Sequence, residues 1–218
     1  MRIEQYKADV RNTVWGNCGL KIAHAYAQFY NFGDNALAYG VKNIFQKYFS
    51  SECRFINYDV HSTSFNKEIL YKISQESDFF IVGGGGLIHT SESKFWLFNM
   101  DIEDIKFLRK PIIFFGLGYN NFTIPLHQDA IKNIKSLSEC SLAFSVRNDG
   151  SRERLSELGL NFTEIPDPGF FVDGNHPRPQ IDGDYIVIQI AYDSPSERNV
   201  NDDFFMQICW IYAKSSSL

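Results

Sequence analysis

Short apolar runs recur along the chain and are separated by longer segments that mix apolar and polar residues. These runs are apolar at nearly every position rather than at alternate ones, which is typical of strands buried on both faces of a parallel sheet. Two weaker runs of the same kind occur near the start of the chain. We predict strands at residues 20–25, 54–58, 78–83, 111–117, 141–146, 162–165 and 185–190.

Amphipathic segments between the runs predict helices. Gly159 follows one of these segments directly, at a position where glycine commonly ends a helix. Alternation of strands and helices implies βαβ units with right-handed crossovers. The pattern therefore predicts an α/β fold with a Rossmann-like, doubly wound, mostly parallel sheet. The predicted helices span residues 36–49, 65–76, 102–108, 126–137 and 149–158.

Residues 173–184 (DGNHPRPQIDGD) interrupt this alternation with prolines and glycines and predict a linker. We expect residues 1–172 to form one lobe, and residues 185–218 to form part of a second lobe with one strand and one helix. This last segment has 34 residues, fewer than the roughly 40 that a separate core usually needs. We expect it to pack on the main lobe, to pair with another chain, or to stay poorly ordered.

Composition and charge narrow the function. The chain has 218 residues, of which 44% are hydrophobic and 22% charged, so the whole chain is neither disordered, collagen-like nor a coiled coil. Its net charge of −5 argues against a general nucleic-acid surface. An anionic substrate would therefore need local cations that act against the mean field of the protein.

The four cysteines form no C-x-x-C pair, and no pair of histidines lies near them at a ligand spacing. This pattern argues against a disulfide framework or a zinc site and favours reduced thiols. The first residues lack the apolar segment of a secretory signal, and no apolar run approaches about 18 residues. We therefore expect a cytoplasmic protein without a membrane span or a bound metal.

In an open α/β sheet, ligands bind outside the carboxyl ends of the strands, so the candidate chemistry follows the apolar runs. The first such segment is NFGDN at residues 31–35. Gly33 permits a tight turn there, and Asp34 or Asn35 can cap the next helix. The alternative is that Asp34 faces the cleft and orients or deprotonates a substrate hydroxyl.

Four consecutive glycines, residues 83–86, end the run at residues 78–83. A tight turn needs one or two glycines, so the excess suggests close approach of the backbone to another group. Exposed N–H groups at Gly84, Gly85 and Gly86 would form a nest for a phosphate or carboxylate. The alternative is a turn packed against a helix. His89 is a further candidate, although a single histidine is more often structural.

The run at residues 111–117 also ends in a glycine-containing segment. Gly116 and Gly118 could allow a ligand to approach the backbone, and Tyr119 and Asn120 offer neutral hydrogen-bonding groups. The alternative there is a glycine-rich turn between strand and helix.

Arg147 directly follows the run at residues 141–146, so its guanidinium can fork onto a carboxylate or phosphate at the sheet edge. The alternative is that Arg147 pairs with Asp149. Asp149 and Ser151 suit the cap of the following helix, and Asp167 between two prolines suits a turn.

Five segments in order, NFGDNAL, DFFIVGGGGLIH, KPIIFFGLGYN, SVRNDGSRERLSELG and IPDPGFF, resemble those of the polysaccharide pyruvyl transferase family. The resemblance implies one lobe of a two-lobed, GT-B-like transferase. Its members move the pyruvyl group of phosphoenolpyruvate onto a sugar hydroxyl, commonly as a ketal, in cell-surface polysaccharide synthesis. It implies that Arg147 holds the anionic donor, that Asp34 lies at the start of the first cleft helix, and that no further cofactor takes part.

This sequence departs from the family pattern in two places. Asn148 follows Arg147 where an acidic residue is usual, and Asp149 comes one place later. Family members also continue through a full second lobe, so we expect the chain by itself to transfer no pyruvyl group. The alternatives are a glycosyltransferase of similar architecture that uses a nucleotide sugar, or a non-catalytic protein that self-associates through its incomplete lobe.

Overall fold

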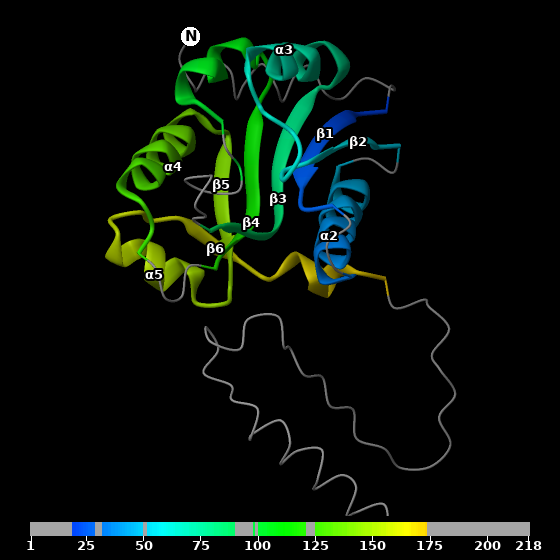
Figure 1. Ribbon diagram of the computed structural model, residues 1–218. Coiled ribbons are helices and arrows are strands. Elements are labelled where there is room, and N and C mark those ends of the chain that lie inside the picture. The colour runs from blue at the N-terminus through cyan, green and yellow to red at the C-terminus, as the bar shows by residue number, and fades with distance from the viewer. Residues whose placement is uncertain are drawn as a thin grey trace, which may run out of the picture. The chain divides into compact units, whose positions relative to one another are not determined.

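Six parallel strands form the sheet that organises the protein (Figure 1). The computed structural model describes residues 19–28, 32–49, 52–89, 98, 100–120 and 125–173. They all belong to one unit, Met1–Asn175, and a second unit spans His176–Leu218. The predicted linker beyond residue 173, the strand at 185–190 and the partial lobe at 185–218 lie outside the described residues.

The strand order is β2-β1-β3-β4-β5-β6, and every neighbouring pair is parallel. The chain moves from β1 outward to β2, and then crosses to β3 on the other side of β1. The carboxyl ends of β1 and β3 therefore flank the switch point where such sheets bind ligands. This all-parallel, Rossmann-like sheet confirms the predicted fold class. The strands are β1 (Lys21–Tyr26), β2 (Arg54–Asp59), β3 (Phe79–Ile88), β4 (Ile112–Tyr119), β5 (Ala143–Arg147) and β6 (Thr163–Ile165).

Helices cover both faces of the sheet (Figure 1). Phe79 and Ile81 of β3 pack with α2, whereas Phe80 and Val82 face the side that carries α3 and α4. This alternation explains why β3 is apolar at every position. The helices are α2 (Phe32–Tyr48), α3 (Lys67–Glu76), α4 (Gln128–Cys140) and α5 (Ser151–Glu157), with short 3-10 helices η1 (Ile102–Phe107) and η2 (Pro168–Phe171).

Two helix predictions need correction. The segment predicted as an α-helix at residues 102–108 forms the 3-10 helix η1 (Ile102–Phe107). So short a segment could form few of the hydrogen bonds between residues four apart that stabilise an α-helix. Helix α2 begins at Phe32 rather than at residue 36, so Gly33 and Asp34 lie inside its first turn. The acidic side chain is favourable there, because the free N–H groups of the first turn carry partial positive charge.

The glycine cluster lies within β3 rather than after it. The strand continues through Gly83 to Ile88, and only Gly86 of the four glycines is not fully buried. Gly83 has φ +146° and Gly84 has φ +80°, values that L side chains rarely adopt. A Cβ on Gly83 would overlap the carbonyl oxygen of Phe115 on β4. The predicted strand end at residue 83 is therefore wrong, because close backbone packing requires these glycines inside the strand.

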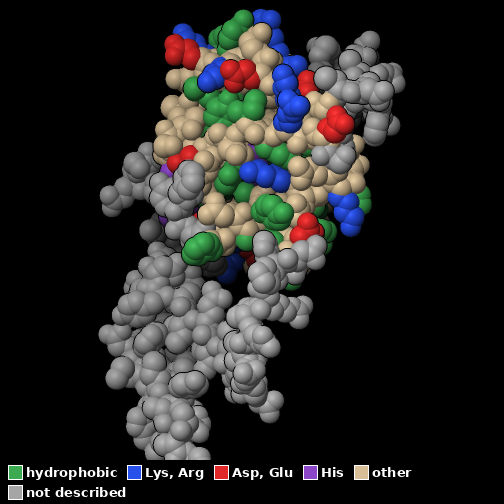
Figure 2. All heavy atoms as spheres, turned by 90° about the vertical axis from the view of Figure 1, so that its right-hand side faces the viewer, with side chains coloured by type: hydrophobic (Ala, Val, Ile, Leu, Met, Phe, Trp, Pro, Cys, Tyr) green, Lys and Arg blue, Asp and Glu red, His purple; other side chains and the backbone are tan. Residues whose placement is uncertain are grey.

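The surface that carries α2 and β2 mixes apolar side chains with charged ones (Figure 2). Within the described ranges, no helix is long and apolar enough to span a bilayer. The two cysteines in these ranges, Cys53 and Cys140, form no disulfide.

The glycine packing makes a direct prediction for stability. Gly83→Ala should lower the free energy of unfolding by about 2–4 kcal/mol, because the added Cβ meets backbone that cannot move aside. Gly85→Ala is the matched control, since its Cβ would lie 3.7 Å from the nearest heavy atoms and its φ is not positive. That variant should differ from the wild type by less than about 1 kcal/mol. Urea denaturation measures both, and equal losses would contradict this account of the cluster.

Candidate functional site

The predicted site residues gather at the carboxyl edge of the sheet. Most of them lie at the ends of β3, β4 and β5, and the rest begin the helices that follow β1 and β5. Gly33 and Asp34 lie in α2, Gly84, Gly85 and Gly86 in β3, Gly116, Gly118 and Tyr119 in β4, Arg147 ends β5 and Ser151 begins α5, while His89 and Asn120 directly follow β3 and β4.

Arg147 is held between two carboxylates. Its Nε donates to Asp149, and its Nη1 lies 3.5 Å from Oδ2 of Asp167. The guanidinium packs on the backbone of Gly118, where a Cβ would overlap it. The side chain of Arg147 is 16% exposed. The structure thus has the pair with Asp149 that the sequence allowed, and adds Asp167 as a second partner.

Asp149 is fixed by the start of α5. Its Oδ1 accepts from the backbone N–H of Ser151 at 3.1 Å and from the hydroxyl of the same residue. Ser151 is buried, and its Oγ accepts from the backbone N–H of Tyr119 at 2.7 Å. The N-cap of α5 is Gly150, which has a left-handed conformation and no side-chain cap, so the predicted cap at Asp149 is wrong. Asp149 lies one residue before it, and its bonds to Ser151 link β4, α5 and Arg147 in one network.

Asp167, the second carboxylate partner of Arg147, is held by η2 and by Asn148. Its Oδ1 accepts from the N–H of Gly169 at 2.7 Å and caps η2, while its own N–H donates to Oδ1 of Asn148 at 3.0 Å. Pro168 lies against Gly116, where a Cβ would be 2.7 Å from its Cγ. Asn148 is the residue that departs from the family pattern, and its amide oxygen orients the backbone that carries the second carboxylate.

A second group of predicted residues meets near the switch point. The carboxylate of Asp34 lies close to Gly85, whose Cβ would be 3.7 Å from Oδ1 of Asp34. The side chain of Asn120 lies over Gly86 and donates to its carbonyl oxygen at 3.4 Å. The described residues thus bring a carboxylate, an amide and the glycine backbone together beside the Arg147 network.

His89 and Tyr119 are two further predicted site residues. His89 is half-buried, and its backbone N–H donates to the carbonyl of Leu87 at 3.0 Å. Tyr119 is buried, with the Arg154 guanidinium 6.0 Å from its ring centroid. Burial raises the pKa of the Tyr119 hydroxyl, so this group stays a neutral hydrogen-bonding partner at neutral pH.

Sequence reasoning missed His24, which lies in the middle of β1. Its ring is fully buried, and Nε2 lies 3.0 Å from the carbonyl oxygen of Gly83. Burial lowers the pKa of His24 to about 3; the bond to Gly83 opposes this shift and the positive charge of Lys42 adds to it. A single histidine inside an apolar strand carries no motif, so only the fold reveals its partner.

Lys42 of α2 lies at the edge of this buried cluster. Its Nζ lies 4.9 Å from the centroid of the Tyr26 ring and 5.8 Å from that of Phe55. Burial lowers the pKa of Lys42. The amine therefore lies on aromatic faces, where cation–π attraction stabilises its charge, and it donates to the Tyr26 hydroxyl at 3.5 Å.

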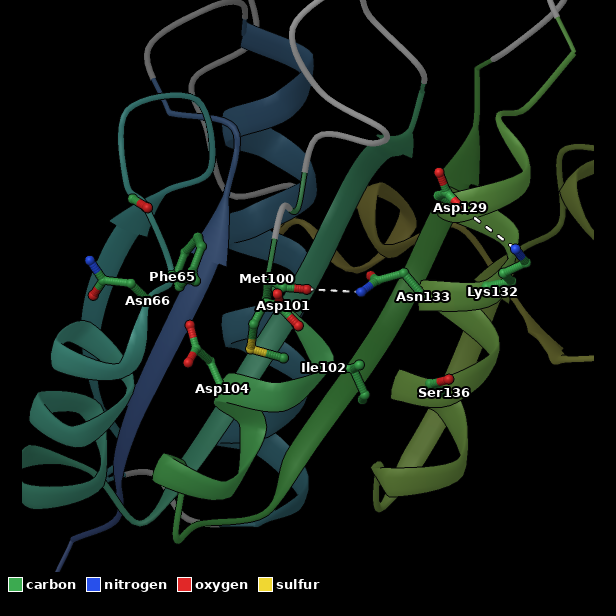
Figure 3. A pocket seen from close by; sticks show the side chains of 11 residues that line it. Phe65, Asn66, Met100, Asp101, Ile102, Asp104, Asp129, Lys132, Asn133 and Ser136 are labelled. Carbon is green, nitrogen blue, oxygen red and sulfur yellow. Dashed lines mark hydrogen bonds and ion pairs between the residues drawn. The ribbon is translucent and has the colours of Figure 1, made fainter.

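A separate cavity of about 440 Å³ lies between α3, η1 and α4 (Figure 3). Asn133 donates to the carbonyl of Met100 at 2.9 Å, and Lys132 pairs with Asp129 at 3.6 Å. Its lining holds three aspartates against one lysine and none of the predicted site residues. That charge balance disfavours an anionic ligand. Across the described part of the chain, no cluster of three or more His, Cys, Asp or Glu side chains could hold a metal ion.

Comparison with known protein families identifies a match over most of the chain. The family model described as Polysaccharide pyruvyl transferase matches residues 31–213, a range that contains every predicted site residue. No curated protein matches the chain.

The buried imidazole of His24 predicts how stability depends on pH. Its pKa is about 3 in the folded protein and near 6.5 in an unfolded chain. The unfolded state therefore binds more protons between these values, and the stabilising contribution present above pH 6.5 is lost as the pH falls towards 3. Between about pH 7 and pH 4, the wild type should lose roughly 3 kcal/mol more than His24→Gln, which has no titrating ring. Urea denaturation across this range measures the difference; a constant gap would show that His24 protonates freely in the fold.

Proposed function

We propose that this chain, which belongs to the polysaccharide pyruvyl transferase family, transfers a pyruvyl group from phosphoenolpyruvate to a sugar hydroxyl in cell-surface polysaccharide biosynthesis. The family match over residues 31–213 is the observation that carries the proposal. A cytoplasmic location belongs to the proposal as well, because the cysteine pattern favours reduced thiols.

The chemistry explains which groups the reaction needs. Phosphoenolpyruvate carries a phosphate and a carboxylate, so it requires a cationic fork and backbone donors. In ketal formation, one sugar hydroxyl oxygen bonds to C2 of the enol while C3 gains a proton. A second sugar hydroxyl oxygen then bonds to C2 as the C2–O bond to phosphate breaks, and each hydroxyl gives up its proton. The reaction thus needs a base for the hydroxyl and an acid for C3, with cations to stabilise the phosphate. In this proposal, Arg147 binds the donor and Asp34 accepts the hydroxyl proton.

The setting of Arg147 supports binding by exchange of anions. Its two carboxylate partners already neutralise the guanidinium, so a donor would replace one of them rather than fill an empty cationic site. Asp149 contacts Nε of Arg147 closely, whereas Asp167 reaches Nη1 only at 3.5 Å. We therefore expect a donor carboxylate or phosphate to take the place of Asp167 on Nη1.

A thermal-shift titration tests the proposed function. Phosphoenolpyruvate should stabilise the wild type, by about 2.7 kcal/mol at a hundredfold excess over Kd, and nucleotide sugars should not. Arg147→Ala should abolish the stabilisation, because the donor loses its cationic fork. Arg152→Ala is the matched control, since Arg152 is exposed on the neighbouring helix α5, and it should bind as the wild type does.

The opposite ligand preference would refute the proposal and favour a glycosyltransferase. Catalysis is assayed separately, with phosphoenolpyruvate and saccharide acceptors. Turnover that Arg147→Ala abolishes and Arg152→Ala preserves is the expected result, and no turnover by a wild type that binds phosphoenolpyruvate would contradict transfer by this chain.

Exchange at Arg147 makes a prediction of its own. Asp167→Asn should strengthen phosphoenolpyruvate binding by about three- to tenfold, because it removes a competing carboxylate while its amide oxygen can still cap η2. Asp129→Asn makes the same change of charge at a half-exposed residue paired with Lys132, and should have little effect. Isothermal titration calorimetry measures both affinities. Weaker binding by Asp167→Asn would mean that Asp167 helps the donor rather than competes with it.

A further inference from the structure

His24 makes its contact where the sheet stops pairing. Strands β1 and β3 pair from Ile22 with Phe79 to Ala25 with Val82, and Gly83 is the first residue beyond this ladder. The carbonyl oxygen of Gly83 lies 3.0 Å from Nε2 of His24, which projects from β1. A side chain therefore supplies the hydrogen bond that the neighbouring strand no longer gives.

The direction of this bond fixes the state of the ring. A carbonyl oxygen only accepts, so Nε2 carries the hydrogen and Nδ1 is bare. Among the residues that the structure describes, none forms a hydrogen bond with Nδ1. The ring lies 4.7 Å from the ring of Tyr26 and 6.3 Å from that of Phe55, measured between centroids. Aromatic packing on the same face of the sheet thus locks the imidazole in the orientation that serves Gly83.

The conformation at Gly83 controls the path of the next three glycines in β3. Gly84 passes close under α2, where a Cβ would lie 3.1 Å from the carbonyl oxygen of Leu37. Gly85 then comes beside the carboxylate of Asp34, and Gly86 beside Asn120. A change of backbone path at Gly83 would therefore move the glycines relative to both polar side chains.

We propose that His24 is a positioning residue, which holds the path of residues 83–86 and thereby sets the candidate donor-binding backbone against Asp34. We assign it no catalytic role, because the ring is fully buried and Nδ1 has no hydrogen-bond partner within the described part of the chain. The consequence for donor binding rests on the proposed function, whereas the hold on the glycine backbone does not.

Amide hydrogen exchange tests the structural half of this inference. His24→Leu removes the donor, and the amides of Gly84, Gly85 and Gly86 should then exchange about tenfold faster. His24→Gln carries an N–H at the same distance along its side chain and should restore most of the protection. Ile22→Val is the matched control, because Ile22 is buried two residues earlier on the same face of β1, and it should leave the glycine amides unchanged.

Equal exchange in the leucine and valine variants would overturn the proposal. If His24→Leu fails to fold, nitrogen-15 NMR of the wild-type ring decides instead. A hydrogen on Nε2 between about pH 7 and pH 5 is expected, and a hydrogen on Nδ1 would overturn the proposal.

The functional half uses the affinity for phosphoenolpyruvate, measured by calorimetry. His24→Leu should weaken binding by about tenfold and His24→Gln should recover it, while Ile22→Val binds as the wild type does. If the wild type binds no phosphoenolpyruvate, the proposed function fails while the exchange result still stands. If binding is unchanged in His24→Leu although exchange is faster, the glycine segment does not hold the donor and this half is wrong.

Discussion

The structure depends on close backbone approach at the carboxyl ends of β3 and β4. Gly83 meets β4, Gly84 meets α2 and Gly118 meets the guanidinium of Arg147, each at a distance that a Cβ would obstruct. Gly116 receives Pro168 in the same way. Because protein interiors are packed to the density of organic crystals, such contacts admit few alternatives. The glycines therefore decide how near α2, η2 and Arg147 come to one edge of the sheet.

That closeness determines the electrostatics of the edge. Arg147 lies between Asp149 and Asp167 in a protein whose net charge is −5. Both carboxylates also accept hydrogen bonds from backbone N–H groups, from Ser151 and Gly169 respectively, so the acids stay ordered without the arginine. A guanidinium held in this way keeps its fork in place, and the cost of orienting it is met by folding rather than by binding. The affinity of Arg147 for an anion then depends on how the free energy of its contact with that anion compares with that of its contacts with the two carboxylates.

For the described residues, the sequence was sufficient to predict the order of strands and helices and the sheet edge where the candidate residues lie, because burial on both faces leaves a plain apolar pattern. It was not sufficient for the first turn of α2. Gly33 and Asp34 looked like a loop, yet the helix includes them, since its first N–H groups need no helical partner. Asp167 was predicted to form a turn and does cap η2, but its contact with Arg147 joins residues 20 positions apart. His24 gave no signal, because its partner is a backbone carbonyl on another strand.

Packing and close approach of a ligand, the two possible reasons for four glycines at residues 83–86, do not apply equally to each glycine. At Gly83, Gly84 and Gly86 the position of a Cβ is crowded by Phe115, by Leu37 and by Asn120. Backbone packing accounts for glycine at Gly83, and a positive φ beside the backbone of Leu37 accounts for it at Gly84. At Gly86 the crowding atoms are the movable end of the Asn120 side chain, so packing constrains this position less. At Gly85 a Cβ would make only ordinary contacts, and the nearest polar one is the carboxylate of Asp34. Packing therefore leaves the glycine at position 85 unexplained. In the proposed function, the donor would therefore lie along the glycine backbone with its charged groups nearer Arg147, because Asp34 repels an anion, and the attacking hydroxyl would lie nearer Asp34.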